Sequence, residues 1–116
     1  MQIQIHRKPL SVNEAWQGKR FKSKAYKAYE QELMVLLPNG YEIPEGELAI
    51  RLEFGLNVLA DWDNPVKPLQ DILQKKYGFN DSRIVKAEVV KKVVKKGDGY
   101  INFEILGIDE YEKYRN

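Results

Sequence analysis

Alternating apolar and polar residues mark several segments of the chain as strands. Residues 2–6 alternate over a short stretch and residues 47–57 over a long one, as a strand with one buried face does. The apolar face of the long segment consists of Leu48, Ile50, Leu52, Phe54 and Leu56. Residues 84–95 are also strand-like, but paired valines and lysines break their alternation, so we expect a β-bulge near Val90. The turn at 97–99 (GDG) predicts a hairpin that returns residues 100–106 as the partner strand.

Helical spacing of apolar residues predicts two longer helices. The first has Ser23 as its N-cap and runs to about Leu37, before a Pro-Asn-Gly break. Its core-facing stripe consists of Tyr26, Tyr29, Leu33, Leu36 and Leu37. The second covers roughly 64–76, with Asn64 as N-cap, and the proline at 68 places its regular start nearer Lys67. Gly78 ends this helix.

The remaining segments are short. Residues 11–21 are expected to form an irregular basic loop, and the last eight residues a short helix or a frayed end. We find no internal repeat and no linker, so residues 1–116 are interpreted as one domain. The predicted fold class is α/β (α+β), with the order β-α-β-α-β-β, a mixed sheet and helices packed on one face.

Composition excludes several kinds of site. The chain has no cysteine and a single histidine, His6, which excludes thiolate metal sites and disulfides and disfavours a histidine-rich site. The N-terminal residues contain no long apolar run, so neither a signal peptide nor a membrane anchor is predicted. We therefore expect a cytoplasmic protein without a membrane partner.

The charges are distributed unevenly although the net charge is only +2. Residues 1–29 contain seven basic residues and one acidic residue, and residues 83–96 contain six basic residues and one acidic residue. Residues 30–82 contain four basic and ten acidic residues. Basic segments on either side of an acidic centre suit a protein that holds a polyanion near a metal ion, although lysines that only solvate exposed faces produce the same pattern.

Two aspartates, Asp61 and Asp63, follow the end of the long buried strand. In extended backbone this spacing places both carboxylates on one side, where their mutual repulsion favours a shared cation. Mg²⁺ prefers carboxylate oxygens and retains water, and Asp81 reaches the same place if the second helix packs antiparallel to the strand. The alternative is that these aspartates cap helices and turns.

A lysine accompanies the aspartates. Lys67 and Asp71 are one helical turn apart and share a face with Asn64. A lysine beside carboxylates can bind a scissile phosphate, while Mg²⁺ lowers the pKa of a bound water and polarises the phosphoryl oxygen. The implied chemistry is metal-assisted hydrolysis, although a solvated or ion-paired Asp71 would look the same in the sequence.

These residues follow a known family pattern. The segments DWDNPVK at 61–67, DIL at 71–73 and NDSRIV at 80–85 resemble the D-x-D-N-x-x-K…D-x-L…D-D-x-x-V signature of the RusA family of Holliday-junction resolvases. The segment PLSVN at 9–13, followed by Trp16, resembles the N-terminal P-x-S-x-N segment of that family. Two departures are Ala60, where the family often has a basic residue, and Asn80, where it has an acidic one.

The resemblance implies a DNA endonuclease of recombination and repair, of a kind often encoded by phages or prophages. Asp61, Asp63 and Asp81 would be catalytic ligands of Mg²⁺, for which Mn²⁺ can substitute, and Lys67 the catalytic lysine. Asp71 and Asn64 would support them. Such proteins are homodimers that bind four-way junctions and other branched DNA and make paired symmetric nicks.

DNA contacts are predicted on the basic segments. The expected phosphate ligands are Lys19, Arg20, Lys22, Lys24 and Arg83. Trp16 and Phe21 lie among the first four and could stack on bases, but we interpret Trp16 as a core anchor. Two other functions stay open: a non-catalytic branched-DNA-binding module on the same scaffold, and a hydrolase of free nucleotides, which the clustered lysines disfavour.

Overall fold

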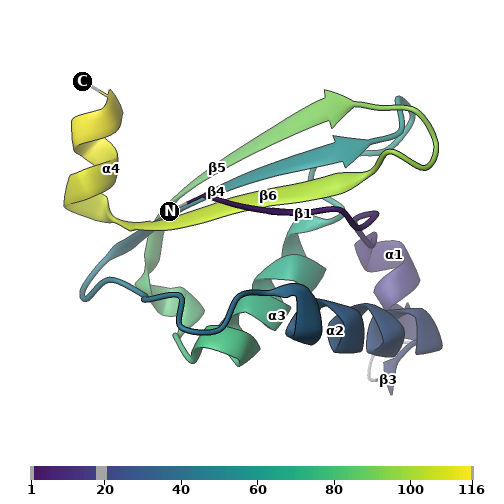
Figure 1. Ribbon diagram of the computed structural model, residues 1–116, viewed down its shortest axis with the longest axis horizontal. Helices are drawn as coiled ribbons and strands as arrows, with labels where there is room; N and C mark the ends of the chain where they lie inside the picture. The colour runs from purple at the N-terminus through teal and green to yellow at the C-terminus, as the bar shows by residue number, and fades with distance from the viewer. Residues whose placement is uncertain (1, 18–20, 116) are drawn as a thin grey trace.

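A mixed four-stranded sheet forms the centre of the molecule, with strands in the order β1-β6-β4-β5 (Figure 1). The computed structural model describes residues 2–17 and 21–115 of the chain. The strands of the sheet are β1 Ile3–Ile5, β4 Leu48–Leu56, β5 Ile84–Val93 and β6 Tyr100–Gly107. A separate antiparallel pair consists of β2 Trp16–Gln17 and β3 Phe21–Lys22.

The helices lie mostly on one side of this sheet. They are α1 Val12–Ala15, α2 Lys24–Leu36, α3 Val66–Tyr77 and α4 Ile108–Arg115, and a 3-10 turn η1 spans Asp81–Arg83. Figure 1 shows α1, α2 and α3 along one face, while α4 lies at one end, beyond the other face. The predicted α+β fold with a mixed sheet is therefore confirmed. No helix in the described part of the chain is long and apolar enough to cross a membrane.

Strand β4 is the most buried strand. It pairs in parallel with β5 on one side and antiparallel with β6 on the other. Its predicted apolar face, from Leu48 to Leu56, is buried against α2 and α3 in the main core. On the other face, Ala49 packs with Leu106 and Tyr111 beneath α4, which makes a second, small core. The alternation of this segment is clear because one face is buried in the main core, while the other face carries the exposed Arg51 and the partly buried Glu53.

Helix α2 begins as the sequence predicts. The Ser23 hydroxyl accepts a hydrogen bond from the Tyr26 backbone N–H at 3.1 Å. Tyr26, Tyr29, Leu33 and Leu37 are buried, but Leu36 is 49% exposed, so its predicted place in the stripe is wrong. Leu37 continues the helical spacing after Leu33, and Leu36 is therefore turned away from the core.

Helix α3 begins at Val66, close to the predicted start. The N-cap is Pro65, without a side-chain capping bond, so the capping role predicted for Asn64 is wrong. The Asn64 carbonyl instead accepts a hydrogen bond from the Val12 N–H at 2.8 Å, which ties α1 to this turn. Pro68 lies in the first turn, where its missing N–H has no intrahelical partner to lose. Gly78 ends the helix in the left-handed conformation with φ 71°, as predicted.

The predicted pairing of β5 with residues 100–106 is wrong. The glycine turn forms, with the Asp98 N–H donating to the Lys95 carbonyl at 3.0 Å, but β4 lies between β5 and β6. The connection crosses the end of β4, where the Val94 N–H donates to the Leu56 carbonyl at 2.9 Å. The apolar β4 takes an inner position, in which it is paired along both of its edges.

The predicted bulge near Val90 is also wrong. The register shifts at the start of β5, where Leu48 pairs with Ile84 and Ala49 with Lys86, so Val85 is the extra residue. The rest of β5 keeps a regular register although its apolar and polar residues do not alternate. No residue of this outer strand is fully buried, so neither face has to be purely apolar.

Helix α1 was not expected in the segment assigned to an irregular loop. Ser11 and Glu14 form a capping box, in which the Ser11 hydroxyl accepts from the Asn13 N–H at 3.1 Å and the Glu14 carboxylate accepts from the Ser11 N–H. The S-x-x-E spacing in the sequence is the signal that would have predicted this turn.

Substitution of Gly55 should destabilise the sheet. A Cβ atom at this position would lie 2.3 Å from the Tyr100 ring, whose hydroxyl donates to Glu53 at 2.7 Å. Gly55→Ala must displace that ring and is expected to cost about 1–3 kcal/mol in the free energy of unfolding by urea. Gly107→Ala is the control, because its Cβ would meet only ordinary contact at 3.6 Å. Equal midpoints for the two variants would contradict this packing.

Candidate functional site

The predicted aspartates lie in a turn between β4 and α3. Strands β4 and β5 are parallel, so their carboxyl ends share one edge of the sheet, where α/β proteins commonly bind ligands. The Asn64 N–H donates to the Asp61 carbonyl at 3.4 Å, and the Val66 N–H to the Asp63 carbonyl at 3.1 Å. Residues 62–65 are thus in turns, and the extended backbone expected between Asp61 and Asp63 is wrong. The two side chains line different cavities as a result.

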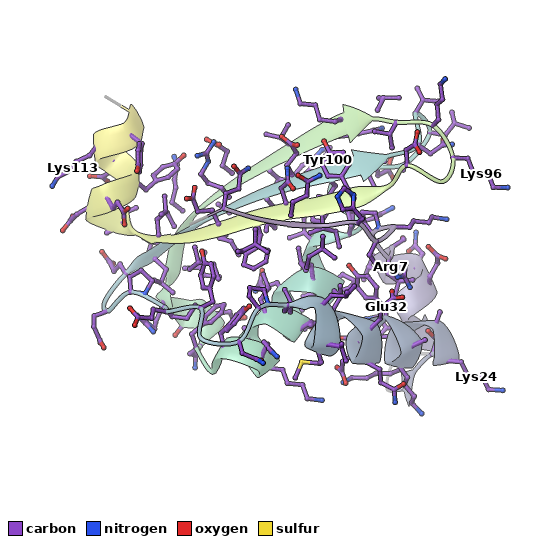
Figure 2. The ribbon with its side chains drawn as sticks, viewed as in Figure 1. Arg7, Lys24, Glu32, Lys96, Tyr100 and Lys113 are labelled. Carbon is purple, nitrogen blue, oxygen red and sulfur yellow. The ribbon has the colours of Figure 1, made fainter. Side chains whose placement is uncertain are left out.

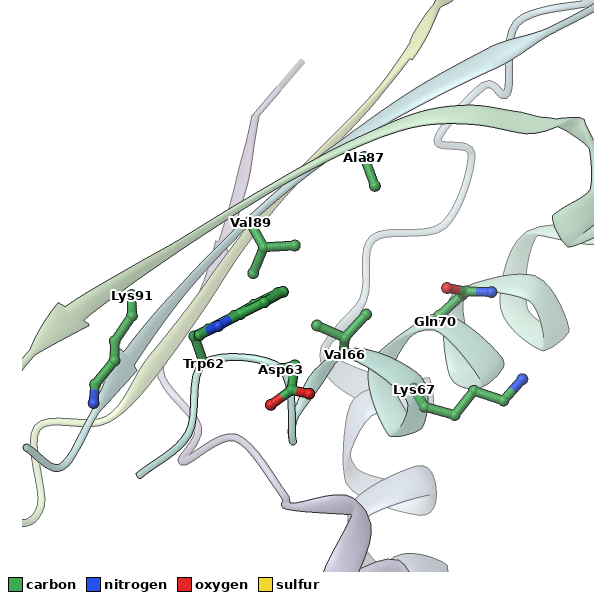
Figure 3. A pocket seen from close by; sticks show the side chains of 8 residues that line it. All are labelled: Trp62, Asp63, Val66, Lys67, Gln70, Ala87, Val89 and Lys91. Carbon is green, nitrogen blue, oxygen red and sulfur yellow. The ribbon is translucent and has the colours of Figure 1, made fainter. Parts of the chain in front are cut away.

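The first cavity, here called the Trp62 groove, lies between β5 and the start of α3 (Figure 3). Its volume is about 790 Å³. The lining residues are Trp62, Asp63, Val66, Lys67, Gln70, Ala87, Val89 and Lys91. Asp63 and Lys67 therefore share one surface depression, as the motif predicts, and Trp62 lies in it beside them.

Polar contacts along α3 extend this arrangement to Asp71 and Asp81. Lys67 Nζ donates to Asp71 Oδ1 at 2.8 Å, which confirms that the two residues share a helix face. Gln70 lines the Trp62 groove and its amide donates to Asp81 Oδ2 at 3.5 Å. Gln70 thus joins the turn that carries Asp81 to the groove that contains Asp63, a role that no pattern in the sequence indicated.

The charge of Lys67 is stabilised by its surroundings. The hydrogen bond to Asp71 raises the pKa of Lys67 most. Burial, the next largest effect, lowers the pKa, and the negative charges of Asp71 and Asp81 raise it further. Its side chain is 56% exposed. Lys67 is therefore a cation that a phosphate can reach.

The second cavity, here called the Lys95 pocket, lies on the other side of the 61–65 turn. Its volume is about 710 Å³. Polar lining residues include Lys8, Ser11, Asp61, Asn64, Lys95 and Lys96. Gly55, Gly97 and Gly99 also line it, so backbone is accessible between these side chains. The structure thus brings together Asp61, Asn64 and lysines from two distant segments. The basic run at 83–96 indicated a cationic surface but not its position beside Asp61.

Lys91 fixes the turn from the neighbouring strand. Its ammonium donates to the backbone carbonyl of Val58 at 3.1 Å and to that of Ala60. Both carbonyls lie within the three residues before Asp61, so Lys91 positions the segment that carries both aspartates. In the sequence Lys91 is one of many lysines, and its role depends on the parallel register of β5 with β4.

The predicted metal ligands do not form one group in the structure. Among the described residues, which include all the predicted aspartates, no three carboxylate or imidazole side chains are grouped closely enough to hold a metal ion. Mg²⁺ uses one or two protein carboxylates when phosphate oxygens and water complete its shell. Asp63 lines the Trp62 groove and Asp81 contacts Gln70 of that groove, so each has a carboxylate of the kind that Mg²⁺ uses, whereas Asp61 lines the Lys95 pocket.

The predicted DNA contacts differ in their surroundings. Lys19 and Arg20 lie outside the described residues. Lys22 donates to Glu30 at 3.2 Å and lies 4.9 Å from the centre of the Tyr26 ring, whereas Lys24 is exposed at the start of α2.

Arg83 has structural contacts. Its guanidinium donates to the Gly46 carbonyl at 2.9 Å and to the Pro44 carbonyl, which fastens the loop before β4 to η1. Its predicted DNA contact would compete with these bonds.

Trp16 is placed against α2. Its ring stacks on Tyr26 at 5.9 Å between centroids, but it is 37% exposed and does not belong to the buried core, so its prediction as a core anchor is wrong. The side chain of Phe21 lies outside the described part of the chain.

Comparison with known proteins adds no relative. No family model matches the chain, and no curated protein matches it. The resemblance to the RusA resolvases therefore rests on the motif residues, of which the structure brings Asp63, Lys67, Asp71 and Asp81 to one side of α3.

The Lys67–Asp71 contact predicts a pKa change. Asp71→Asn should lower the pKa of Lys67 towards its ordinary value, and Asp81→Asn should lower it less, because the hydrogen bond to Asp71 is the largest cause of the shift. Since the folded-state pKa is raised, the stabilisation from this pair is present below the unfolded-state pKa of lysine and is lost as pH rises through that of Lys67.

The measurement is an NMR titration of the Lys67 side-chain resonances. Asp109→Asn, on α4, is the control and should leave the titration unchanged. An unaltered Lys67 titration in Asp71→Asn would show that the ion pair does not form in solution.

Proposed function

We propose that this protein is a Mg²⁺-dependent endonuclease that cuts Holliday junctions and other branched DNA, in the manner of the RusA resolvases. The observation that carries the proposal is that Asp63 and Lys67 line the same groove as Gln70, whose amide donates to Asp81 at 3.5 Å. These residues come from the turn, the helix and η1, and they correspond to separate parts of the family motif.

Each residue has a distinct role in the proposal. Asp63 and Asp81 would supply carboxylate oxygens for Mg²⁺, whereas Asp61 lines the Lys95 pocket and is not part of this metal site. The bound ion supplies an activated water and polarises the phosphoryl oxygen. Lys67, kept protonated by Asp71, holds a non-bridging oxygen of the phosphate and offsets negative charge as the bond to the leaving oxygen breaks.

The distribution of charge supports a DNA substrate. Lysines of the Lys95 pocket lie beside the 61–65 turn, and Figure 2 shows Lys96 and Lys24 towards the same end of the molecule, with Lys113 at the opposite end. Cations from several segments at one end suit a phosphate backbone that passes across the turn. Paired symmetric nicks require two such sites, so the proposal includes a homodimer, and it places the protein in the cytoplasm.

A second candidate is a branched-DNA-binding module without nuclease activity. The division of Asp61 and Asp63 between two cavities favours it, because the described residues contain no complete carboxylate set for a metal. The lysines and the fold would then serve binding alone.

A four-way junction labelled on each strand separates the two candidates. With Mg²⁺ or Mn²⁺, the endonuclease should produce paired nicks at symmetric positions, mapped on all four strands by denaturing electrophoresis. A protein that binds the junction and leaves every strand intact with either metal would support the binding module.

Asp63→Asn should abolish cleavage and leave junction affinity unchanged or slightly higher, because it removes a metal ligand and a negative charge near the DNA. Asp109→Asn, an exposed aspartate on α4, is the matched control and should cut normally. Cleavage by Asp63→Asn at the rate of the unaltered protein would place the chemistry elsewhere.

The Lys95 pocket predicts a salt effect. Lys95→Gln combined with Lys96→Gln should lower the slope of log affinity against log salt concentration by about two, through the loss of two phosphate contacts. Lys113→Gln, on α4, should leave the slope unchanged. Affinity is measured by fluorescence anisotropy with a junction at several salt concentrations, and an unaltered slope in the double variant would exclude this pocket from the DNA path.

A further inference from the structure

Trp62 is exposed in a groove, whereas several other large aromatic side chains of the fold are buried in the apolar core. The side chain is 55% exposed, whereas Tyr26, Tyr29 and Phe54 are almost completely buried. Figure 3 shows the indole between Lys91 and Val66, below Val89. A large aromatic ring that stays accessible in a depression is a common feature of ligand sites.

The groove around Trp62 combines apolar walls with polar groups. Val66, Ala87 and Val89 line it, so a flat ligand would meet apolar side chains beside the indole. The carboxylate of Asp63 and the amide of Gln70 also line it and can accept or donate hydrogen bonds. Lys67 adds an accessible cation. An aromatic plane, polar edge groups and a cation together match the parts of a nucleotide.

We infer that the Trp62 groove takes one unpaired nucleobase of the DNA, stacked on the Trp62 indole. The inference rests on the proposed function and specifies its substrate as DNA with an accessible, unpaired base next to the phosphate held by Lys67. The base covers the apolar surface, and its edge reaches Asp63 or Gln70. A base in an intact duplex is held in the stack, while a base at a branch point is released at a lower cost.

Charge favours a nucleobase over a second copy of the chain as the occupant. The centres of protein–protein interfaces are depleted in charged residues, whereas Asp63, Lys67 and Lys91 all line this groove. An apolar protein surface would remove water from the Lys67–Asp71 pair, whereas a nucleotide in the groove would offer Lys67 a phosphate oxygen in addition to the Asp71 carboxylate.

Tryptophan fluorescence tests the inference directly, because the chain contains only two tryptophans. Trp16→Phe leaves Trp62 as the single emitter, and Trp62→Phe is the matched variant that retains Trp16. Each is titrated in EDTA with a four-way junction, with a fully paired duplex and with that duplex carrying one unpaired base, while binding is followed by anisotropy.

The emission of Trp16→Phe should be quenched by the junction and by the duplex with an unpaired base, and much less by the paired duplex. The emission of Trp62→Phe should change little with any of them. Unchanged emission of Trp62 at saturating DNA would overturn the inference.

A second variant measures the contribution of stacking to affinity. Trp62→Leu keeps an apolar side chain but removes the aromatic plane, and it should bind DNA with an unpaired base about 5- to 100-fold more weakly, with little effect on the paired duplex. Equal weakening for both DNAs would contradict base stacking. A change in self-association by light scattering, without a change in DNA affinity, would assign the groove to a second copy of the chain and overturn the inference.

These measurements separate the inference from the proposed function. Binding and quenching are recorded without a divalent metal, so they do not depend on cleavage. DNA cleavage without any change in Trp62 emission would overturn base stacking alone. Quenching of Trp62 without cleavage in Mg²⁺ or Mn²⁺ would support base stacking, while the nuclease proposal would fail.

Discussion

Pairing of β4 along both of its edges is the constraint on which the rest of the structure depends. Its apolar face carries the main core beneath α2 and α3, and its other face carries the small core beneath α4. Because β4 and β5 are parallel neighbours, the chain between them must return over one face of the sheet to the edge where β5 begins. Helix α3 forms that return connection. The turn that carries Asp61 and Asp63 is the entrance to this connection, so the position of the candidate site follows from the parallel pair.

The parallel pair also explains the contacts that hold the site. Lys91 in β5 lies beside the end of β4 only because of the register between them, and there its ammonium binds the carbonyls before Asp61. The backbone N–H of Val12, in α1, donates a hydrogen bond to the Asn64 carbonyl. The 61–65 turn is thus supported from two segments that are distant in sequence, with one cavity on each side of it.

Much of the fold could be predicted from local signals. Ser23 caps its helix and Gly78 ends the next one, as local signals predict, and the alternation within residues 47–57 predicts strand β4. The order of the strands could not be predicted in the same way. A glycine turn at 97–99 favours a hairpin locally, but competition for the two edges of β4 decides which strands become neighbours.

In the candidate site, too, local contacts could be predicted from the sequence and tertiary contacts could not. The Lys67–Asp71 pair was predictable from helical spacing, and it forms. The predicted placement of Asp61 and Asp63 on one side assumed an extended backbone, but hydrogen bonds fold this segment into turns. Gln70 and Lys91 had no signal of their own, because their roles arise from residues that approach through the tertiary fold.

The outer position of β5 has a consequence for solubility. No strand in the described part of the chain pairs with its far edge, so the backbone groups along the outer edge of this ten-residue strand have no strand partner. Such an edge is a template for strands of other molecules, and charged side chains, lysines above all, discourage that pairing. Lys86, Lys91 and Lys92 lie along β5, and two of them are exposed. The lysines of this strand therefore protect the protein from aggregation through its longest unpaired edge.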